Sequence, residues 1–231
     1  MTHRRKQAER KVQHPNVPAV GGALTLAVWI CLLAAAPADA RAQALMAPDA
    51  VVAGLSQEDW SRAWWQWAGS FSAEESPVAD RTGDLCGGKQ KGPVWFLAGT
   101  YGTQRTIRTC KVPAGKHLFF PLINYVVMPT SDGSTTCASA TGTAQRITNA
   151  PAMLLLNIDG QTLSHLVNHR QATKNCFDMG ALTVEKYRVF PSAANGYYAM
   201  LKPLSKGTHI LNFGGVLPGM IQSVTYTLIV D

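Results

Sequence analysis

Four of the six tryptophans of this 231-residue chain lie within the short segment 60–67. Ser56 and Asp59 precede it with the spacing of a capping box, which predicts that a helix begins after Ser56. Four residues then recur at the spacing of one helical face: Trp60, Ala63, Trp64 and Trp67. We therefore expect a helix with a tryptophan-rich face that ends near Gly69.

This helical face constrains the fold because it is too apolar to remain in water. Three indoles present roughly 450–750 Å² of surface, as much as or more than the largest exposed patch of a typical soluble monomer. Covering it would contribute up to about 11–19 kcal/mol. We expect Trp60, Trp64 and Trp67 to pack against a sheet, and a ligand or partner surface is the alternative. Trp65 lies about 100° around the helix from Trp64, and we expect it to be the least buried.

The first 44 residues are organised like an export signal. Five basic residues within positions 4–11 precede an apolar stretch over 21–36, which is shorter than a membrane-spanning helix. Small residues then allow cleavage after Ala40, Ala42 or Ala44. We predict a signal peptide over 1–44 and a single disulfide-stabilised domain over 45–231. An uncleaved anchor is the alternative.

The net charge of +7 belongs mostly to this signal. It holds six Lys or Arg and two Asp or Glu, and the remaining fifteen basic and twelve acidic residues give +3. After residue 44 the sequence has no basic stripe with interleaved aromatic residues, which argues against nucleic acid as a partner. We expect a periplasmic or extracellular protein that meets the membrane only through its signal peptide, before cleavage.

Four cysteines follow the predicted signal: Cys86, Cys110, Cys137 and Cys176. An even number in an exported chain predicts two disulfides. Four cysteines allow three pairings, and Cys86–Cys110 with Cys137–Cys176 is favoured because sequence neighbours make the fewest crossed connections. None of the spacings is the two to four residues typical of zinc ligands, so we predict no metal and no cofactor.

From residue 93 onward the pattern is that of a β protein. Segments 93–100 and 117–124 are apolar on both alternating faces, as central strands are, and Asp159-Gly160 between apolar runs indicates a hairpin. Further strands are expected in 106–116, 153–166, 182–190, 197–204, 209–215 and 222–230. Segment 130–145, rich in Ser, Thr and Gly, is expected to be a long surface loop. The predicted fold is mainly β, an antiparallel β-sandwich or jelly-roll-like single domain with one N-terminal tryptophan-rich helix.

Four motifs of the chain resemble those of a known family. They are WWQWA at 64–68, GPVWFLAGT at 92–100, VPAGKHLFFPLIN at 112–124 and GYYAMLKPLSKGTHILNFGG at 196–215. In this order, behind a signal peptide, they resemble a family of uncharacterised secreted bacterial signal-peptide proteins. The resemblance covers nearly all of the mature chain. It implies export and a single domain, and it carries no catalytic or binding residue across.

Few residues form a pattern that is associated with catalysis. Neither a Gly-x-Ser-x-Gly elbow nor a P-loop is present. The candidates for an acid–base pair are two histidines and two carboxylates: His117, His209, Asp178 and Glu185. His165 and His169 have the spacing of two metal ligands on a helix, but the glutamate of the metalloprotease motif is missing, so two surface histidines are favoured.

These observations favour a secreted, non-catalytic β-sandwich protein that acts through a binding surface for an unknown ligand. One alternative is a carbohydrate-binding module, and its aromatic candidates are Trp65, Trp95, Tyr197 and Tyr198. The other is a secreted hydrolase with a histidine–carboxylate pair. The expected partner is a glycan or another extracytoplasmic protein.

Overall fold

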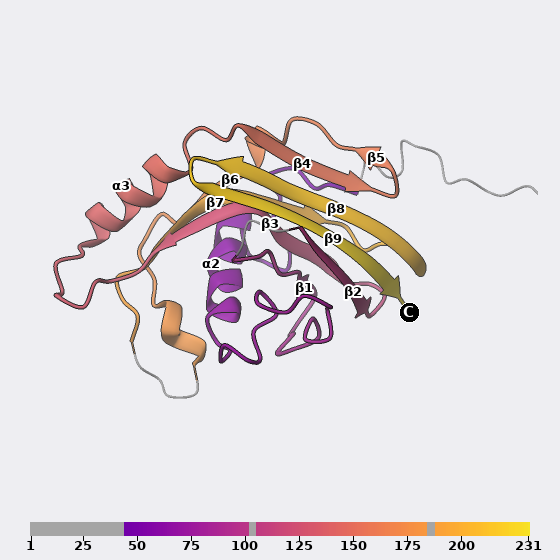
Figure 1. The fold of residues 1–231 in the computed structure, drawn as a ribbon, viewed down its shortest axis with the longest axis horizontal. Coiled ribbons are helices and arrows are strands. Elements are labelled where there is room, and N and C mark those ends of the chain that lie inside the picture. Colours follow the sequence, from indigo (N-terminus) through magenta and orange to yellow (C-terminus); the bar gives the residue numbers. More distant parts are fainter. Residues whose placement is uncertain (1–43, 102–104, 184–187) are drawn as a thin grey trace, which may run out of the picture. The chain divides into compact units, whose positions relative to one another are not determined.

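In the residues that the computed structural model describes, 44–101, 105–183 and 188–231, nine strands form two sheets (Figure 1). The four-stranded sheet has the order β1-β3-β7-β6, with β1 Val94–Phe96, β3 His117–Val127, β7 Ala193–Leu201 and β6 Arg170–Ala172. The five-stranded sheet has the order β2-β9-β8-β4-β5, with β2 Thr106–Val112, β9 Met220–Val230, β8 Gly207–Leu217, β4 Met153–Ile158 and β5 Gln161–Thr162. The helical elements are α2 Gln57–Ala68, α3 Cys137–Ile147 and the short 3₁₀ turns η1 Leu166–His169 and η2 Met179–Leu182. The predicted mainly β, sandwich-like fold with a tryptophan-rich helix is confirmed, and the predicted signal peptide lies outside the described residues except for Ala44.

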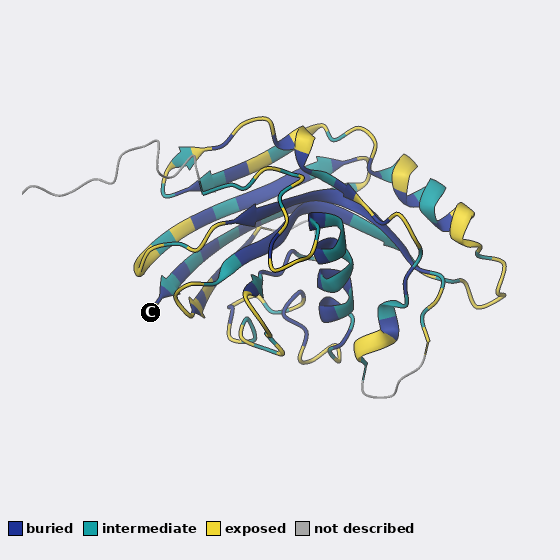
Figure 2. Cartoon of the chain, turned by 180° about the vertical axis from the view of Figure 1, so that it is seen from behind, coloured by how far each residue is buried: buried dark blue, intermediate teal, exposed yellow. Residues whose placement is uncertain are grey.

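The four-stranded sheet is covered on both of its faces. Phe120 of β3 meets Phe213 of β8 with ring centroids 4.5 Å apart, so one face packs on the five-stranded sheet. The neighbouring Phe119 stacks on Tyr198 of β7 at 5.4 Å and belongs to the cluster that contains the α2 tryptophans. All nine residues of β7 are buried, and Figure 2 shows buried residues gathered in the strands and exposed residues in the connecting loops. Apolar character on both strand faces is therefore explained by two covering layers.

Helix α2 begins and packs as the sequence predicts. Ser56 caps it, because its hydroxyl accepts from the Asp59 N–H at 3.1 Å and the Asp59 carboxylate accepts in return. The tryptophans at 60, 64, 65 and 67 are 8, 2, 9 and 3 % exposed. Each indole N–H donates to an acceptor at 3.0–3.1 Å; the four acceptors are the carbonyls of Val52, Leu97 and Gly88 and the hydroxyl of Tyr198. Burial of this face is confirmed, and it includes Trp65.

Two strand pairs are parallel, which differs from the antiparallel sandwich expected. They are β1 with β3 and β2 with β9, and the other pairs of the described strands are antiparallel. A parallel pair needs a crossover connection between its strands. Between β1 and β3 this connection is β2, which lies in the other sheet. Local sequence patterns carry no information on such a change of sheet.

The Asp159-Gly160 hairpin is confirmed. Asn157 pairs with Thr162 and Ile158 with Gln161, which leaves a two-residue turn between β4 and β5. Both turn residues have positive φ, 50° at Asp159 and 87° at Gly160, as a type I′ turn requires.

Two segments differ from the sequence predictions. The expected loop 130–145 contains most of α3, which is capped by Thr136 and buries Ala140 and Ala144. Its Ser, Thr and Gly residues have low helix propensity, and tertiary packing together with the Cys137 disulfide outweighs that preference. The strand expected over 182–190 is wrong in its described part, because Leu182 ends η2 and residues 188–190 have no strand structure. Residues 184–187 lie outside the described residues.

The favoured disulfide pairing is confirmed. Cys86 is bonded to Cys110 and Cys137 to Cys176. Disulfides persist in oxidising compartments, so both bonds are consistent with an extracytoplasmic location. Among the described residues, no helix combines the length and the apolar character that crossing a membrane requires.

Removing the Cys86–Cys110 bond tests how much this link stabilises the fold. For a separation of 24 residues, we expect the double variant Cys86→Ser/Cys110→Ser to lose roughly 3–4 kcal/mol of unfolding free energy, measured by urea denaturation. Lys111→Ser is the control and should leave the urea midpoint unchanged, because Lys111 is exposed beside Cys110. An unchanged urea midpoint in the double variant would contradict the expectation.

Candidate functional site

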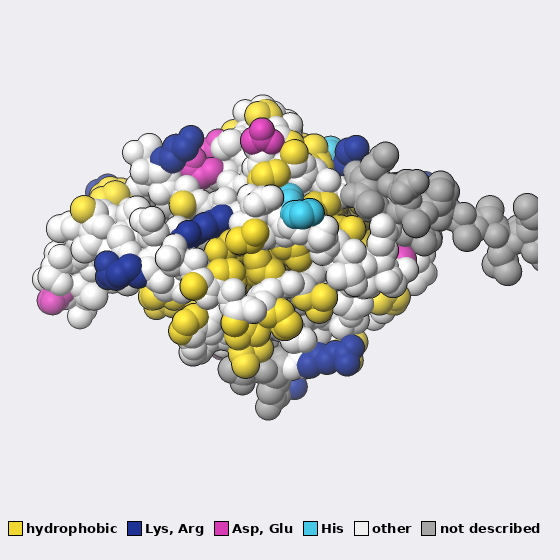
Figure 3. All heavy atoms as spheres, turned by 90° about the horizontal axis from the view of Figure 1, so that it is seen from above, with side chains coloured by type: hydrophobic (Ala, Val, Ile, Leu, Met, Phe, Trp, Pro, Cys, Tyr) yellow, Lys and Arg dark blue, Asp and Glu magenta, His cyan; other side chains and the backbone are white. Residues whose placement is uncertain are grey.

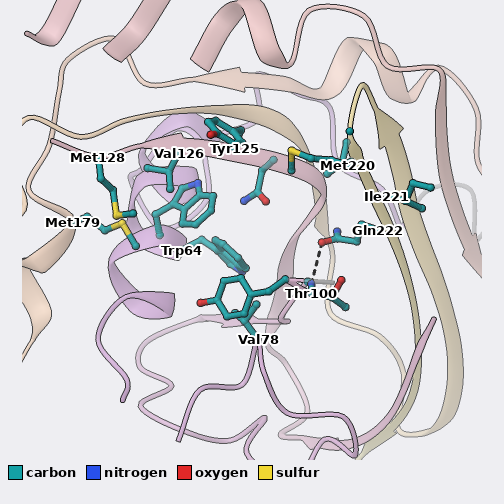
Figure 4. A pocket seen from close by; sticks show the side chains of 16 residues that line it. Trp64, Val78, Thr100, Tyr125, Val126, Met128, Met179, Met220, Ile221 and Gln222 are labelled. Atoms are coloured by element: carbon teal, nitrogen blue, oxygen red, sulfur yellow. Dashed lines mark hydrogen bonds between the residues drawn. The ribbon is translucent and has the colours of Figure 1, made fainter. Parts of the chain in front are cut away.

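A cleft with a volume of about 360 Å³ opens beside α2, which we call the Trp65 cleft (Figure 4). It is lined by Trp64 and Trp65 of α2, Val78, residues 99–101 after β1, residues 123–126 of β3, Met128, Met179 of η2 and residues 219–222 at the β8–β9 turn. Segments far apart in the sequence meet here because α2 covers β3 and β7 while the β8–β9 hairpin lies against the other face of β3.

The wall of the Trp65 cleft is mostly apolar and adaptable. The rings of Trp64 and Trp65 meet edge to face with centroids 5.1 Å apart. Three methionines, Met128, Met179 and Met220, contribute flexible thioether side chains. The lining residues include no Asp, Glu, Lys, Arg or His.

A buried tyrosine lies behind this wall and bears two hydrogen bonds. The indole N–H of Trp65 donates to the Tyr198 hydroxyl at 3.0 Å, and the Asn124 amide lies 3.1 Å from the same hydroxyl. Tyr198 is fully buried and Asn124 is 8 % exposed. Burial raises the pKa of the Tyr198 hydroxyl well above its usual value. Tyr198 is therefore a neutral hydroxyl.

Gln222 ties three walls of the cleft together. Its Nε2 donates to the carbonyls of Pro121 and Leu122 at 2.7 and 2.8 Å, and its Oε1 accepts from the Thr100 N–H at 3.1 Å. A Cβ at Gly99 would lie 2.2 Å from this oxygen, so only glycine fits there. The Gln222 amide thus holds the chain after β1 against β3 and β9 (Figure 4).

Arg108 supports two parts of the cleft wall from the protein interior. It is 1 % exposed, and its guanidinium donates at 2.8–3.1 Å to the carbonyls of Asp80, Ala98, Gly99 and Val78 and to the Tyr226 hydroxyl. A planar fork of five N–H groups suits several diverging acceptors. Because Val78 and Gly99 line the Trp65 cleft, Arg108 fixes the spacing of two of its walls.

The aromatic residues predicted for sugar binding do not form one platform. Tyr197 and Tyr198 are 1 % and 0 % exposed, and the Tyr197 hydroxyl donates to the Thr148 carbonyl at 3.1 Å. Trp95 packs against the core between the sheets. Trp65 alone among these candidates lines the cleft. The rings of Tyr197 and Tyr198 are therefore not accessible for stacking on a sugar, because β7 is covered on both faces.

The predicted acid–base residues do not come together in the Trp65 cleft. Asp178 caps η2, and its Oδ1 accepts from the N–H groups of Gly180 and Val189 at 2.9 and 2.8 Å. His117 begins β3, and burial lowers the pKa of its imidazole. Glu185 lies outside the described residues. None of His117, His209 and Asp178 lines the Trp65 cleft.

His209 does meet a carboxylate, but a different one from those predicted. Its Nδ1 lies 2.8 Å from the Asp159 carboxylate. Its Nε2 lies 2.9 Å from the Ser205 carbonyl and 3.4 Å from the Ser205 hydroxyl. A general base needs a ring nitrogen free to accept the proton of a nucleophile, and here a carbonyl holds that nitrogen. The cluster ties the β4–β5 turn to β8, where Asp159 also accepts from the Ile210 N–H at 2.8 Å.

The spacing of His165 and His169 does not correspond to a helical ligand pair. His165 has a left-handed backbone, and His169 ends the four-residue turn η1. Within residues 44–101, 105–183 and 188–231, no group of three or more His, Cys, Asp or Glu side chains is placed to hold a metal ion.

A second apolar area lies on the outer face of the five-stranded sheet. Figure 3 shows hydrophobic side chains gathered on the face seen from above, and the exposed large residues of this sheet are Ile107, Met153, Leu155, Ile210 and Ile221. Polar pairs cross the same sheet, with Asn157 opposite Asn212 and Asn212 opposite Thr225. Among the described residues, this face has no buried polar side chain comparable to Asn124, so the Trp65 cleft is the better-formed site.

Asn124, Gln222 and Arg108 were not singled out from the sequence. Asn124 ends an apolar run, whereas Arg108 and Gln222 lie in segments that contain other polar residues. Asn124 ends the motif at 112–124, which is the one signal that could have drawn attention to it.

Comparison with protein-family models, with curated proteins and with solved structures gives no match to this chain.

Arg108 can be tested against its neighbour Arg105. We expect Arg108→Met to lose about 3 kcal/mol or more of unfolding free energy, because it leaves several buried acceptors without a donor. Arg105 is exposed and donates only to the Thr225 hydroxyl at 3.2 Å, so Arg105→Met should change stability by less than about 0.5 kcal/mol. Urea denaturation measures both, and equal effects would show that Arg108 has no special structural role.

Proposed function

We propose that this chain is an exported binding protein that holds a small, neutral, largely apolar molecule in the Trp65 cleft. The observation that carries this proposal is a preformed cleft of about 360 Å³ whose lining is apolar and free of ionisable Asp, Glu, Lys, Arg and His side chains. Ligand sites in proteins are concave, mostly apolar and typically about 300–1,000 Å³ in volume. The two disulfides and the signal-like segment 1–44 support export.

The charge of the lining favours a neutral ligand. A carboxylate or an ammonium group would lose its hydration on entering the cleft and would find no opposite charge among the lining residues. An apolar molecule loses no hydrogen bonds to water and gains contact with Trp64, Trp65 and the methionines.

The polar groups of the lining residues also bear on the carbohydrate-binding alternative. A sugar carries several hydroxyl groups that each need a partner when buried. Both hydrogens of the Gln222 amide already bind carbonyls, and Tyr198 is fully buried. The other polar side chains of the lining are few: Thr100, Tyr101, Asn124 and Tyr125. The cleft therefore suits an apolar ligand better than a glycan. The proposed resemblance to a secreted bacterial family implies nothing about ligand chemistry.

Binding of N-phenyl-1-naphthylamine, a neutral apolar fluorophore, tests the proposal. We expect saturable enhancement of its emission, and a loss of affinity of at least tenfold in Val126→Phe, which fills space in the cleft lined by Val126. Val167→Phe is the matched control, because Val167 is 59 % exposed in η1 and does not line the cleft.

Equal affinities of Val126→Phe and Val167→Phe would place the probe elsewhere and contradict the proposal. Competition with soluble oligosaccharides gives the comparison with the alternative. Displacement of the probe by a glycan but not by a small hydrocarbon would favour the carbohydrate-binding reading.

Binding should also be insensitive to pH. The lining includes no histidine, the side chain whose ordinary pKa lies between pH 5 and 8. His117 and His169, whose pKa values are lowered by desolvation, do not line the cleft either. We expect the affinity for N-phenyl-1-naphthylamine to change less than twofold over this range. An affinity that changes with a midpoint near pH 6.5 would indicate a histidine at the binding site.

A further inference from the structure

The three residues behind the Trp65 cleft form a chain of hydrogen bonds with a defined direction. The Trp65 indole has one N–H and no acceptor, so at 3.0 Å it can only donate to the Tyr198 oxygen. The Tyr198 hydroxyl also carries its own hydrogen, which needs an acceptor. Tyr198 is fully buried, and an unsatisfied buried donor costs about 1–3 kcal/mol.

Asn124 is the partner that can accept this hydrogen. Among the described residues, Trp65 and Asn124 are the side chains that hydrogen-bond the Tyr198 hydroxyl. With Asn124 Nδ2 at 3.1 Å, the hydroxyl meets two donors and its own hydrogen has no acceptor. Half a turn of the amide exchanges Nδ2 and Oδ1 without changing its shape. The hydrogen bonds then run from Trp65 to Tyr198 to Asn124 Oδ1, so that the Trp65 N–H and the Tyr198 hydroxyl hydrogen each have an acceptor.

This orientation leaves the Asn124 Nδ2 group available to the cleft. Asn124 lines the cleft and is more than nine-tenths buried. Apart from its bond to Tyr198, its amide has no hydrogen-bond partner in the described part of the chain. The neighbouring Gln222 offers no competing donor, since its Nε2 binds two carbonyls at 2.7 and 2.8 Å.

We infer that the Trp65 cleft selects a neutral apolar ligand that carries a hydrogen-bond acceptor, such as a ketone, ester or ether oxygen, and that Asn124 Nδ2 donates to it. This inference rests on the proposed function and adds a chemical class to the ligand. Trp65 and Tyr198 are positioning residues, since they act by orienting the Asn124 amide.

Two matched ligand pairs test the direction of the Asn124 amide. 1-Indanone differs from indane by an acceptor oxygen, and indole differs from indene by a donor N–H. The four dissociation constants are measured by displacement of N-phenyl-1-naphthylamine from the wild-type protein and from Asn124→Leu, a variant of similar size without the amide. Within each pair, the preference for one ligand over the other is compared between the wild type and the variant. The difference in hydration between the two ligands is the same in both proteins and therefore cancels.

We expect the preference for 1-indanone over indane to fall about fivefold to tenfold in Asn124→Leu. The preference for indole over indene should change less than twofold. A loss confined to the indole pair would mean that Asn124 presents its oxygen to the cleft, and unchanged preferences in both pairs would mean that Asn124 does not contact the ligand. Either outcome overturns the inference.

These failures are distinct from failure of the proposed function, in which the fluorophore does not bind or binds equally well to Val126→Phe. Thermal unfolding shows whether Asn124→Leu is folded. If it is not, Asn124→Asp at pH 9 replaces it, because the carboxylate accepts from Tyr198 and offers the ligand no hydrogen. The same fall in the 1-indanone preference is expected there, and its absence overturns the inference.

Discussion

The structure depends on covering both faces of the four-stranded sheet. Phe120 and Phe119 are adjacent in β3, and they pack on β8 and on the α2 cluster, respectively. Neither covering layer alone would bury a strand such as β7, in which every residue is inaccessible. The tryptophans of α2 provide one cover because they combine large apolar surfaces with single N–H groups that reach backbone carbonyls. Burial of the four-stranded sheet thus requires both the helix and the five-stranded sheet.

The Trp65 cleft lies at the edge of the layer that α2 forms over the four-stranded sheet. Trp65 lies beside the main buried face of α2, with its N–H bonded to Tyr198 and part of its ring lining the cleft. An apolar cleft stays open only if its walls resist collapse. Gln222 and Arg108 provide this resistance, since their side chains bind carbonyls of the surrounding segments through several hydrogen bonds each. Their polar groups are occupied by the protein itself, which leaves the lining apolar.

The sequence predicts those parts of the molecule that local physics decides. The capping box at Ser56, the turn at Asp159-Gly160 and the burial of the tryptophan face depend on short-range spacing and on large apolar areas, and the structure confirms them. The parallel pairing of β1 with β3 is long-range, and α3 forms against the propensity of its residues. The site was only partly accessible for the same reason. Trp65 could be named from its position on the helix, whereas Asn124 gains its role from a tyrosine 74 residues away.

The use of polar side chains to hold the fold together limits what the cleft can recognise. Buried polar groups are costly unless paired, so the fold uses nearly all of them internally. Tyr198 satisfies Trp65, Gln222 satisfies the β3 carbonyls, and the His209 ring lies between the Asp159 carboxylate and the Ser205 carbonyl. What is left for a ligand is mostly apolar surface, with half of the Asn124 amide and the hydroxyls of Tyr101 and Tyr125 among the lining side chains. A molecule that binds there is driven in mainly by leaving water, and the few polar groups of the lining, the buried Asn124 amide among them, decide between ligands of similar shape. The small number of polar groups in the lining follows from how many of the other polar groups are used to hold the fold together.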